Sequence, residues 1–275
     1  MKLILLCLHG WGANHHSFDE LRKELNGSGI EILTPDLPGF GKEPEPEKPW
    51  TTYDYAEWVM EWVKIHIPPP LPLPQGRDAS PKGEVLFALL GHSHGGRIAI
   101  KLASRYSLHT THYKLEHLFL CAAAGIRHPR HIKRAIGLTL AKTGKLFLSI
   151  PGIRYLQPIG KKLLYKLVRV HDYELASSIM RQTMINVCKE DLRPLLKNIR
   201  VPTDIFWGED DGMTTMSDGI FMHRQIKGSH LHTYPHTRHR VHRDRAKEIA
   251  QIIMSNVTLS STKGGIACHS SSSSP

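Results

Sequence analysis

The sequence predicts an α/β protein whose core is a mostly parallel, doubly wound sheet. Short apolar segments typical of strands buried on both faces alternate along the chain with segments of helical periodicity. This alternation favours parallel strands whose connecting helices cover both faces of the sheet. The 275 residues are enough for one large domain with an insertion, and no internal repeat is visible.

The chain begins with an expected strand at Leu3–Leu8, which is followed by the turn sequence HGWG. A capping-box pattern, Ser17-Phe-Asp-Glu20, predicts a helix that ends near Leu25. A second strand is expected at Ile30–Leu33, before the turn sequence PDLPGFG. The first part of the chain therefore predicts a strand, a helix and a second strand.

The next expected helix covers Thr52–Ile65, with Thr52 as its N-cap. The dense prolines of Pro68–Gly83 exclude a helix and a central strand, so this stretch is expected to be a surface connection. Val85–Leu90 is a continuous apolar run that predicts a buried strand. Arg97–Tyr106 then has helical periodicity.

The second half of the chain begins with an expected buried strand at Leu118–Ala122. The long segment Gly125–Arg200 has a mostly helical pattern. Two more strands are expected at Asp204–Trp207 and Leu231–Tyr234, and a last helix at Arg243–Ser255. From residue 258 to 275 the chain is rich in serine and predicts a disordered tail.

The positive charge of the chain is concentrated in one segment. Residues 126–171 hold eleven Lys and Arg and no Asp or Glu, and the whole chain has a formal net charge of +11. We favour amphipathic helices with solvated basic faces over a binding surface. Weak contact with anionic surfaces is the alternative, and nucleic acid is not expected because no nucleic-acid-binding motif accompanies the charge.

Other features of the composition indicate a cytoplasmic globular protein. No apolar run reaches the roughly 18 residues that span a membrane, and the N-terminus lacks the pattern of a secretory signal. The four cysteines are spaced neither as a zinc site nor as a disulfide framework. They are Cys7, Cys121, Cys188 and Cys268.

Four turn sequences are expected to meet at one edge of the sheet. HGWG, PDLPG, GHSHGG and WGEDD each follow a predicted strand. In open parallel sheets, active groups collect at the carboxyl ends of the strands. The candidate functional residues should therefore lie in these four turns and in the loops beside them.

The segment GHSHGG fits the pattern G-x-S-x-G, in which a serine stands on a sharp turn between a strand and a helix. Ser93 is the candidate nucleophile of this turn. Gly91 and Gly95 are expected where a side chain would collide with the neighbouring strand or helix. An ordinary strand-to-helix loop is the alternative, but the buried strand before the pattern and the helix after it favour the nucleophile.

A nucleophilic serine needs a base, and the base needs an acid that orients it. The segment WGEDD supplies acids after a predicted strand. With these motifs the sequence resembles the α/β-hydrolase superfamily of serine hydrolases, whose pattern W-G-x-x-D selects Asp211 as the acid. We expect Glu209 and Asp210 to lie in a solvated turn.

The choice of the base is more open, because four histidines lie between residues 232 and 242. The resemblance implies His239, since an acid, Asp244, follows it by five residues. Arg238 and Ala246 depart from the Gly and Pro that the family usually has at these positions. His236 is the alternative base, and a metal site formed by the cluster is not expected.

The sequence His9-Gly10-Trp11-Gly12 resembles the oxyanion turn of the family. By this resemblance, the backbone N–H groups of Trp11 and His94 stabilise a developing oxyanion. The side chain of His94 is expected at the pocket entrance, and that of His92 beneath the turn. The expected structural residues of the two turns are His9, Gly10, Gly12, Gly91 and Gly95.

The resemblance also implies a domain organisation. Residues 1–124 and 201–257 would form the α/β-hydrolase core, and residues 125–200 a helical cap that excludes water from the pocket and shapes it. The chain starts at the strand that is usually the third of this fold. Asp204 lies where the family usually has an apolar residue, so its carboxylate should be exposed or paired.

The expected function is hydrolysis of carboxylic esters, with lactones as a further substrate class, through Ser93, His239 and Asp211 and an acyl-enzyme. No cofactor is implied, and the partner is a small-molecule ester. Hydrolysis of a carbon–carbon bond, as in the ring-cleavage enzymes, is one alternative. A catalytically degenerate binding protein is another. The natural substrate, its acyl and alcohol preference and the oligomeric state stay open.

Overall fold

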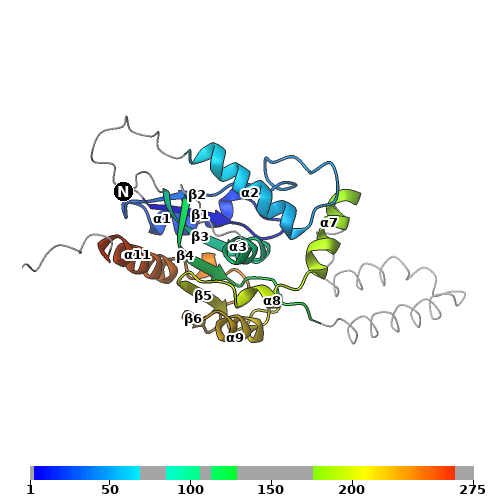
Figure 1. The fold of residues 1–275 in the computed structure, drawn as a ribbon. Coiled ribbons are helices and arrows are strands. Elements are labelled where there is room, and N and C mark those ends of the chain that lie inside the picture. The colour runs from blue at the N-terminus through cyan, green and yellow to red at the C-terminus, as the bar shows by residue number, and fades with distance from the viewer. Residues whose placement is uncertain (1–2, 69–84, 106–112, 129–175, 264–275) are drawn as a thin grey trace, which may run out of the picture.

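The computed structural model describes residues 3–68, 85–105, 113–128 and 176–263. Its core is a parallel sheet with the strand order β2-β1-β3-β4-β5-β6 (Figure 1). The strands are β1 (Leu3–Leu8), β2 (Ile30–Leu33), β3 (Val85–His92), β4 (Tyr113–Cys121), β5 (Thr203–Gly208) and β6 (Ser229–Tyr234). The predicted α/β class with a mostly parallel sheet is confirmed.

Helices cover both faces of this sheet. Helices α2, α3 and α9 lie on one face, and α1 and α11 on the other (Figure 1). The helices of the described residues are the 3₁₀ helix η1 (His15–Phe18), α1 (Asp19–Glu24), α2 (Thr52–His66), α3 (His94–Arg105), α7 (Ser178–Lys189), α8 (Arg193–Leu196), α9 (Met216–Gln225), α10 (Val241–Asp244) and α11 (Ala246–Lys263).

The central strands bury side chains on both faces, which explains their unbroken apolar sequences. In β1, Leu6 packs in the cluster that includes Val59 of α2, whereas Leu5 and Cys7 pack in the cluster that includes Ile249 of α11. Successive side chains of a strand point to opposite faces. The layers on the two sides of the sheet are therefore built from alternating residues of the same strands.

The strand order reverses between β1 and β3. β1 pairs with β2 on one side and with β3 on the other, and Leu8 at the end of β1 is in register with Gly91 near the end of β3. A reversal of this kind leaves a crevice beyond the carboxyl ends of the two strands. The turns HGWG and GHSHGG both start at this point of the sheet.

Two predicted N-caps are wrong. Asn14, rather than Ser17, caps the first helical segment by accepting a hydrogen bond from the His16 N–H. Thr51, rather than Thr52, caps α2 in a capping box with Asp54. In both places more than one residue of a capping type lies near the helix start, and the tertiary fold selects among them.

The last helix is longer than the sequence predicts. α11 continues past Ser255 to Lys263, so the start of the expected disordered tail is helical. The chain has no Gly or Pro between Ser255 and Lys263 that would end the helix, and Gly264 is the next breaker. Residues 264–275 of the expected tail lie outside the described residues.

Most of the expected cap also lies outside the described residues, because these stop at residue 128 and resume at residue 176. The basic segment 126–171 is therefore largely outside them as well. The described end of the insertion contains α7 and α8. α7 is bonded to the loop before α2, since the Trp50 N–H donates to Thr183 Oγ1 over 2.9 Å and Asn186 Nδ2 donates to the Trp50 carbonyl.

Asp204 of β5 is buried and paired, as expected for a carboxylate in this position. Its oxygens accept hydrogen bonds from His117 Nε2 over 2.7 Å, His232 Nε2 over 2.6 Å and Asn256 Nδ2 over 2.7 Å. Burial alone would raise the pKa of Asp204. The hydrogen bonds from the two histidines outweigh burial and hold this pKa far below its ordinary value.

Among the described residues, no helix combines the length and the apolar character needed to cross a bilayer.

Candidate active site

Ser93 stands on a strained turn between β3 and α3. Its φ angle is +52°, in the left-handed region that non-glycine residues rarely adopt. Backbone hydrogen bonds hold this conformation, because the Ser93 N–H donates to the Cys121 carbonyl over 3.2 Å and the Ser93 carbonyl accepts from the Ala124 N–H over 2.9 Å. The end of β4 therefore fixes the turn at the end of β3.

Gly95, two residues after Ser93 in the G-x-S-x-G pattern, is required because the start of α3 lies very close to the backbone at the end of β1. A Cβ at Gly95 would collide with the carbonyl group of Leu8 at the end of β1. The Gly95 N–H also donates to the His9 carbonyl over 3.0 Å. The first turn of α3 thus lies directly against the HGWG turn, as the sequence pattern predicts.

Asp211 lies in the turn after β5 and is buried, with 6% of its surface exposed. Its Oδ1 accepts hydrogen bonds from the N–H groups of Met213 over 2.7 Å and Thr214 over 3.1 Å. Burial raises the pKa of Asp211, but the hydrogen bond and charge of His239, the Met213 N–H and the Thr214 hydroxyl together lower it by more, so the net shift is downward. Glu209 and Asp210 are exposed in the turn, as expected.

His239 lies between Ser93 and Asp211 and is close enough to bond to both. Its Nε2 lies 2.9 Å from Ser93 Oγ, and its Nδ1 lies 2.8 Å from Asp211 Oδ2. Because the carboxylate accepts, Nδ1 carries the proton and Nε2 is free to accept from the serine hydroxyl. The structure therefore brings together three side chains from residues 93, 211 and 239.

A glycine at the end of β5 makes room for the loop that carries His239. A Cβ at Gly208 would collide with the carbonyl oxygen of Thr237. The Asp210 N–H donates to the same carbonyl over 3.0 Å. The glycine of the W-G-x-x-D sequence thus allows the loop with the base to lie against the loop with the acid.

The other histidines of the cluster have different surroundings. His232 binds Asp204. His236 is exposed and has a φ angle of +54°. His242 is buried against His92, with 3.9 Å between the ring centroids. Among the described residues, His239 is therefore the histidine that bonds to Ser93.

His9 holds the HGWG turn in place. Its Nδ1 donates to the Gly10 carbonyl over 2.8 Å, and its Nε2 accepts from the Leu37 N–H over 2.9 Å. Both bonds suit a neutral imidazole, and burial lowers the pKa of His9. The buried His9 therefore ties the end of β1 to the PDLPG loop.

The two expected oxyanion donors lie on neighbouring loops. The rings of Trp11 and His94 meet edge to face with centroids 5.3 Å apart. His94 is the first residue of α3, directly after Ser93. Among the hydrogen bonds of the described residues, none uses the N–H of Trp11 or of His94. Both N–H groups are thus unused within the described residues, and that of His94 lies at the positively polarised start of α3.

The side chain of His94 is not exposed at a pocket entrance. It is 4% exposed and packs edge to face on Tyr55 and Trp11, and its Nε2 has no hydrogen-bond partner among the described residues. Burial lowers the pKa of His94 to about 3. The expectation is wrong because α3 begins at residue 94, which turns this side chain toward α2. His92 lies beneath the turn, as expected.

Thr214 belongs to the site, although the sequence patterns did not reveal it. Its Oγ1 lies 2.8 Å from Asp211 Oδ2, 3.1 Å from the Ala122 carbonyl oxygen and 3.3 Å from His239 Nδ1. The available signal was a hydroxyl residue three positions after the acid, a spacing at which it can bond back to that acid.

The arrangement of Ser93, His239 and Asp211 is one that can activate a serine hydroxyl. A hydroxyl is hydrogen-bonded to a neutral imidazole, which is in turn oriented by a buried carboxylate, and this arrangement can make the hydroxyl nucleophilic. Among the described residues, no group of three or more His, Cys, Asp or Glu side chains is placed to hold a metal ion.

Known proteins share this architecture. The chain is 27% identical over 237 residues to a pimeloyl-[acyl-carrier protein] methyl ester esterase of Neisseria meningitidis serogroup C, covering 82% of this chain and 81% of that protein. It is 24% identical to Lipase 1 of Psychrobacter immobilis, covering 75% of this chain and 62% of that protein. A solved esterase structure from Exiguobacterium antarcticum matches with a TM-score of 0.65 and 22% identity, covering 93% and 92% of the two chains.

A family profile also matches most of the chain. The profile described as the alpha/beta hydrolase family matches residues 5–252, from within β1 to within α11, and this range includes Ser93, Asp211 and His239. The relatives named above are esterases and a lipase. The chain is therefore a hydrolase that belongs to the alpha/beta hydrolase family.

Proposed function

We propose that this protein hydrolyses carboxylic esters, with Ser93 as nucleophile, His239 as general base and Asp211 as the orienting acid. The observation that supports the proposal most strongly is the hydrogen-bonded series from Ser93 Oγ to His239 Nε2 and from His239 Nδ1 to Asp211. The esterase names of the relatives support the same reaction class.

In the acylation step, Ser93 Oγ attacks the ester carbonyl while His239 Nε2 takes the hydroxyl proton. The negative charge that develops on the carbonyl oxygen is stabilised by the N–H groups of Trp11 and His94. Asp211 stabilises the imidazolium that forms. His239 then donates the proton to the departing alcohol, which leaves an acyl group on Ser93.

In the deacylation step, a water molecule takes the place of the alcohol. His239 accepts a proton from this water as it attacks the acyl carbonyl, and the same two N–H groups stabilise the second oxyanion. The carboxylic acid is released, and the proton returns to Ser93 Oγ. The cycle needs no group beyond the chain, the ester and water.

Methyl esters of acyl chains are the first substrates to examine. The relative from Neisseria meningitidis carries the words methyl ester esterase in its name. The aromatic rings of Trp11, in the HGWG turn, and Phe40 pack edge to face with centroids 4.9 Å apart, and such a pair would offer an apolar wall to an acyl chain. Lactones are a second class, because their ring-opening uses the same attack on an ester carbonyl.

The test is a hydrolysis assay on a panel of esters. The panel holds p-nitrophenyl esters of increasing acyl length, a monomethyl dicarboxylate and a simple lactone. The wild type is expected to turn over at least one of them, and Ser93→Ala to lose about 10⁵-fold or more in kcat. Ser217→Ala, which removes an exposed hydroxyl of α9, is the matched control and should keep wild-type activity.

Two other outcomes would replace the proposal. Turnover of a vinylogous β-diketone acid without turnover of any ester would assign the site to carbon–carbon bond hydrolysis. A wild type that is folded but inert toward the whole panel, with Ser93 unreactive toward a fluorophosphonate, would indicate a binding protein built on a hydrolase fold.

A further inference from the structure

His92 makes a hydrogen bond to the backbone of the histidine that contacts Ser93. It is the last residue of β3 and directly precedes Ser93. Its Nε2 lies 2.9 Å from the carbonyl oxygen of His239. Because a carbonyl can only accept, His92 Nε2 carries the proton and donates it to this bond.

Two adjacent residues of one turn therefore hold both ends of His239. Ser93 bonds to the ring of His239, and His92 bonds to its carbonyl group. Since residues 92 and 93 share a peptide bond, the position of the base is tied to the position of the nucleophile by a short closed path. A base must lie within hydrogen-bond reach of the proton that it removes.

The ring of His239 is held by Ser93 and Asp211, whereas its carbonyl group depends on His92. Among the hydrogen bonds of the described residues, the bond from His92 is the one that reaches the His239 carbonyl. His236, which lies three residues before His239 in the same loop, has a φ angle of +54°. Neighbouring contacts must maintain this strained conformation. The bond from His92 thus fixes the backbone of the loop at the residue that contacts Ser93.

The ring of His92 is also fixed by packing. It is 6% exposed and lies between two imidazoles, with centroid distances of 4.9 Å to His239 and 3.9 Å to His242. Burial, followed by the nearby His242 and His239, lowers the pKa of His92 well below its ordinary value, and the bond to the His239 carbonyl and the charge of Asp211 offset this only in part. This shift favours the neutral imidazole of His92.

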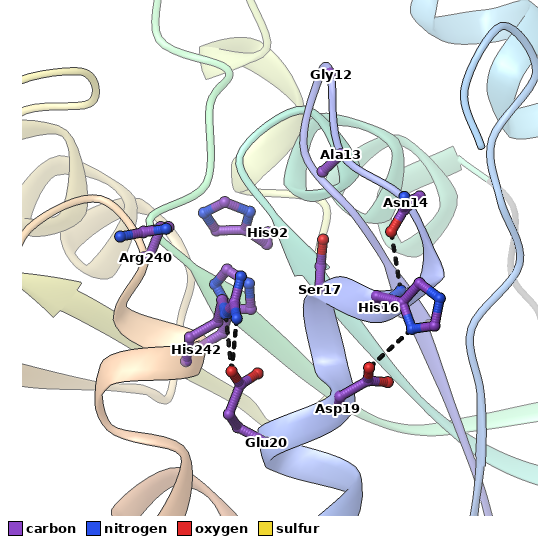
Figure 2. A pocket seen from close by; sticks show the side chains of 11 residues that line it. Gly12, Ala13, Asn14, His16, Ser17, Asp19, Glu20, His92, Arg240 and His242 are labelled. Atoms are coloured by element: carbon purple, nitrogen blue, oxygen red, sulfur yellow. Dashed lines mark hydrogen bonds and ion pairs between the residues drawn. The ribbon is translucent and has the colours of Figure 1, made fainter.

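A cavity of about 440 Å³ reaches the edge of the His92 ring. Figure 2 shows His92 and His242 beside each other on one wall of the cavity, with Ser17 and Asn14 across from them. His92 Nδ1 is buried and has no hydrogen-bond partner among the described residues. Gly10 leaves space for the ring, because a Cβ there would lie 3.0 Å from His92 Nδ1.

We propose that His92 is a positioning residue for the reaction, whose Nε2–H holds the His239 carbonyl and so keeps the His239 ring within reach of Ser93. This role rests on the proposed function of Ser93 and His239. The positioning role requires a hydrogen-bond donor at residue 92. A role in packing alone would require only a side chain with the volume of the imidazole ring.

Matched substitutions separate the donor from the volume. His92→Leu removes the donor and keeps much of the volume, and its kcat should fall about 10- to 100-fold while KM changes little. His92→Gln places an amide N–H near the same point and should recover most of kcat. His242→Phe keeps the ring that packs on His92, makes no bond to His239, and should keep the wild-type kcat.

Chemical rescue of His92→Ala by a small molecule that fills the space of the lost ring gives an independent measurement. His92→Ala should enlarge the cavity beside His239, and added imidazole should raise its kcat at least several-fold. Thiazole has a similar ring but no N–H donor, so it should not restore activity. Equal rescue by both compounds, or wild-type kcat in His92→Leu, would overturn the proposal.

The structure of His92→Leu gives a readout that does not depend on turnover. The distance from His239 Nε2 to Ser93 Oγ, 2.9 Å in the wild type, should lengthen beyond hydrogen-bond reach. An unchanged distance would overturn the role of His92 even if the wild type hydrolysed no ester. Conversely, an active wild type that needs Ser93 but not His92 would refute this role alone and leave the proposed function intact.

Discussion

Asp211 Oδ2 lies 2.8 Å from His239 Nδ1, so the buried carboxylate sets both the tautomer and the orientation of the imidazole. Asp211→Asn should lower kcat about 10²- to 10⁴-fold, because an amide can present its NH₂ group to Nδ1 and favour the wrong tautomer. The measurement is steady-state ester hydrolysis. The exposed neighbour gives the control: Asp210→Asn should keep wild-type activity, and equal losses in both variants would contradict the assignment.

The two candidate bases can be separated directly. His239→Asn should reduce ester hydrolysis to the level of Ser93→Ala, because the serine loses its proton acceptor. His236→Asn should stay active, since His236 is exposed and asparagine tolerates the left-handed conformation at φ +54°. If His236→Asn were inactive and His239→Asn active, the base would be His236.

The hydroxyl of Thr214 should matter for catalysis more than for folding. Thr214→Val removes the hydroxyl that lies 2.8 Å from Asp211 Oδ2. Because the carboxylate then loses one of the hydrogen bonds that hold it in place, kcat should fall about 10-fold. Thr214→Ser keeps the hydroxyl and should recover the activity. The measurement is the steady-state kinetics of the two variants together with their melting temperatures. Equal activities of Thr214→Val and Thr214→Ser would count against a catalytic role of the hydroxyl.

Asp204 should make the stability of the fold depend on acid pH. Its pKa is lower in the folded chain than the ordinary value of about 3.9, so its contribution to stability is fully present above that value and is lost as pH falls below it. Urea unfolding of the wild type and Asp204→Asn should differ most near neutral pH, and the difference should shrink as pH falls below about 4. A difference that does not change with pH would contradict this role.

The position of Ser93 could be predicted because its constraints are local in sequence. A strand, a glycine-flanked turn and a helix follow one another within GHSHGG, and the collision of a Cβ at Gly95 with Leu8 shows why the pattern is fixed. Asp211 was predictable for a similar reason, since Gly208 and the acid lie in one turn. The parallel arrangement of the strands followed from the alternation of apolar strands and helices, whereas their order in the sheet came from the structure.

The base could not be fixed with the same certainty, because its position depends on contacts between distant segments. His239 meets Ser93 across 146 positions of sequence, and the loop that carries it has Arg238 where the family pattern has glycine. His92 likewise meets the His239 carbonyl across 147 positions, and Thr214 meets the Ala122 carbonyl across 92. Helix caps were shifted by one to three residues because several neighbouring side chains could serve.

The most direct test of the central claim is labelling of the intact protein with a fluorophosphonate, followed by peptide mass spectrometry. Ser93 should carry the label in the wild type, and His239→Asn should label far more slowly because the hydroxyl then keeps its proton. Label on a serine other than Ser93, or an undiminished rate in His239→Asn, would contradict the claim that His239 activates Ser93.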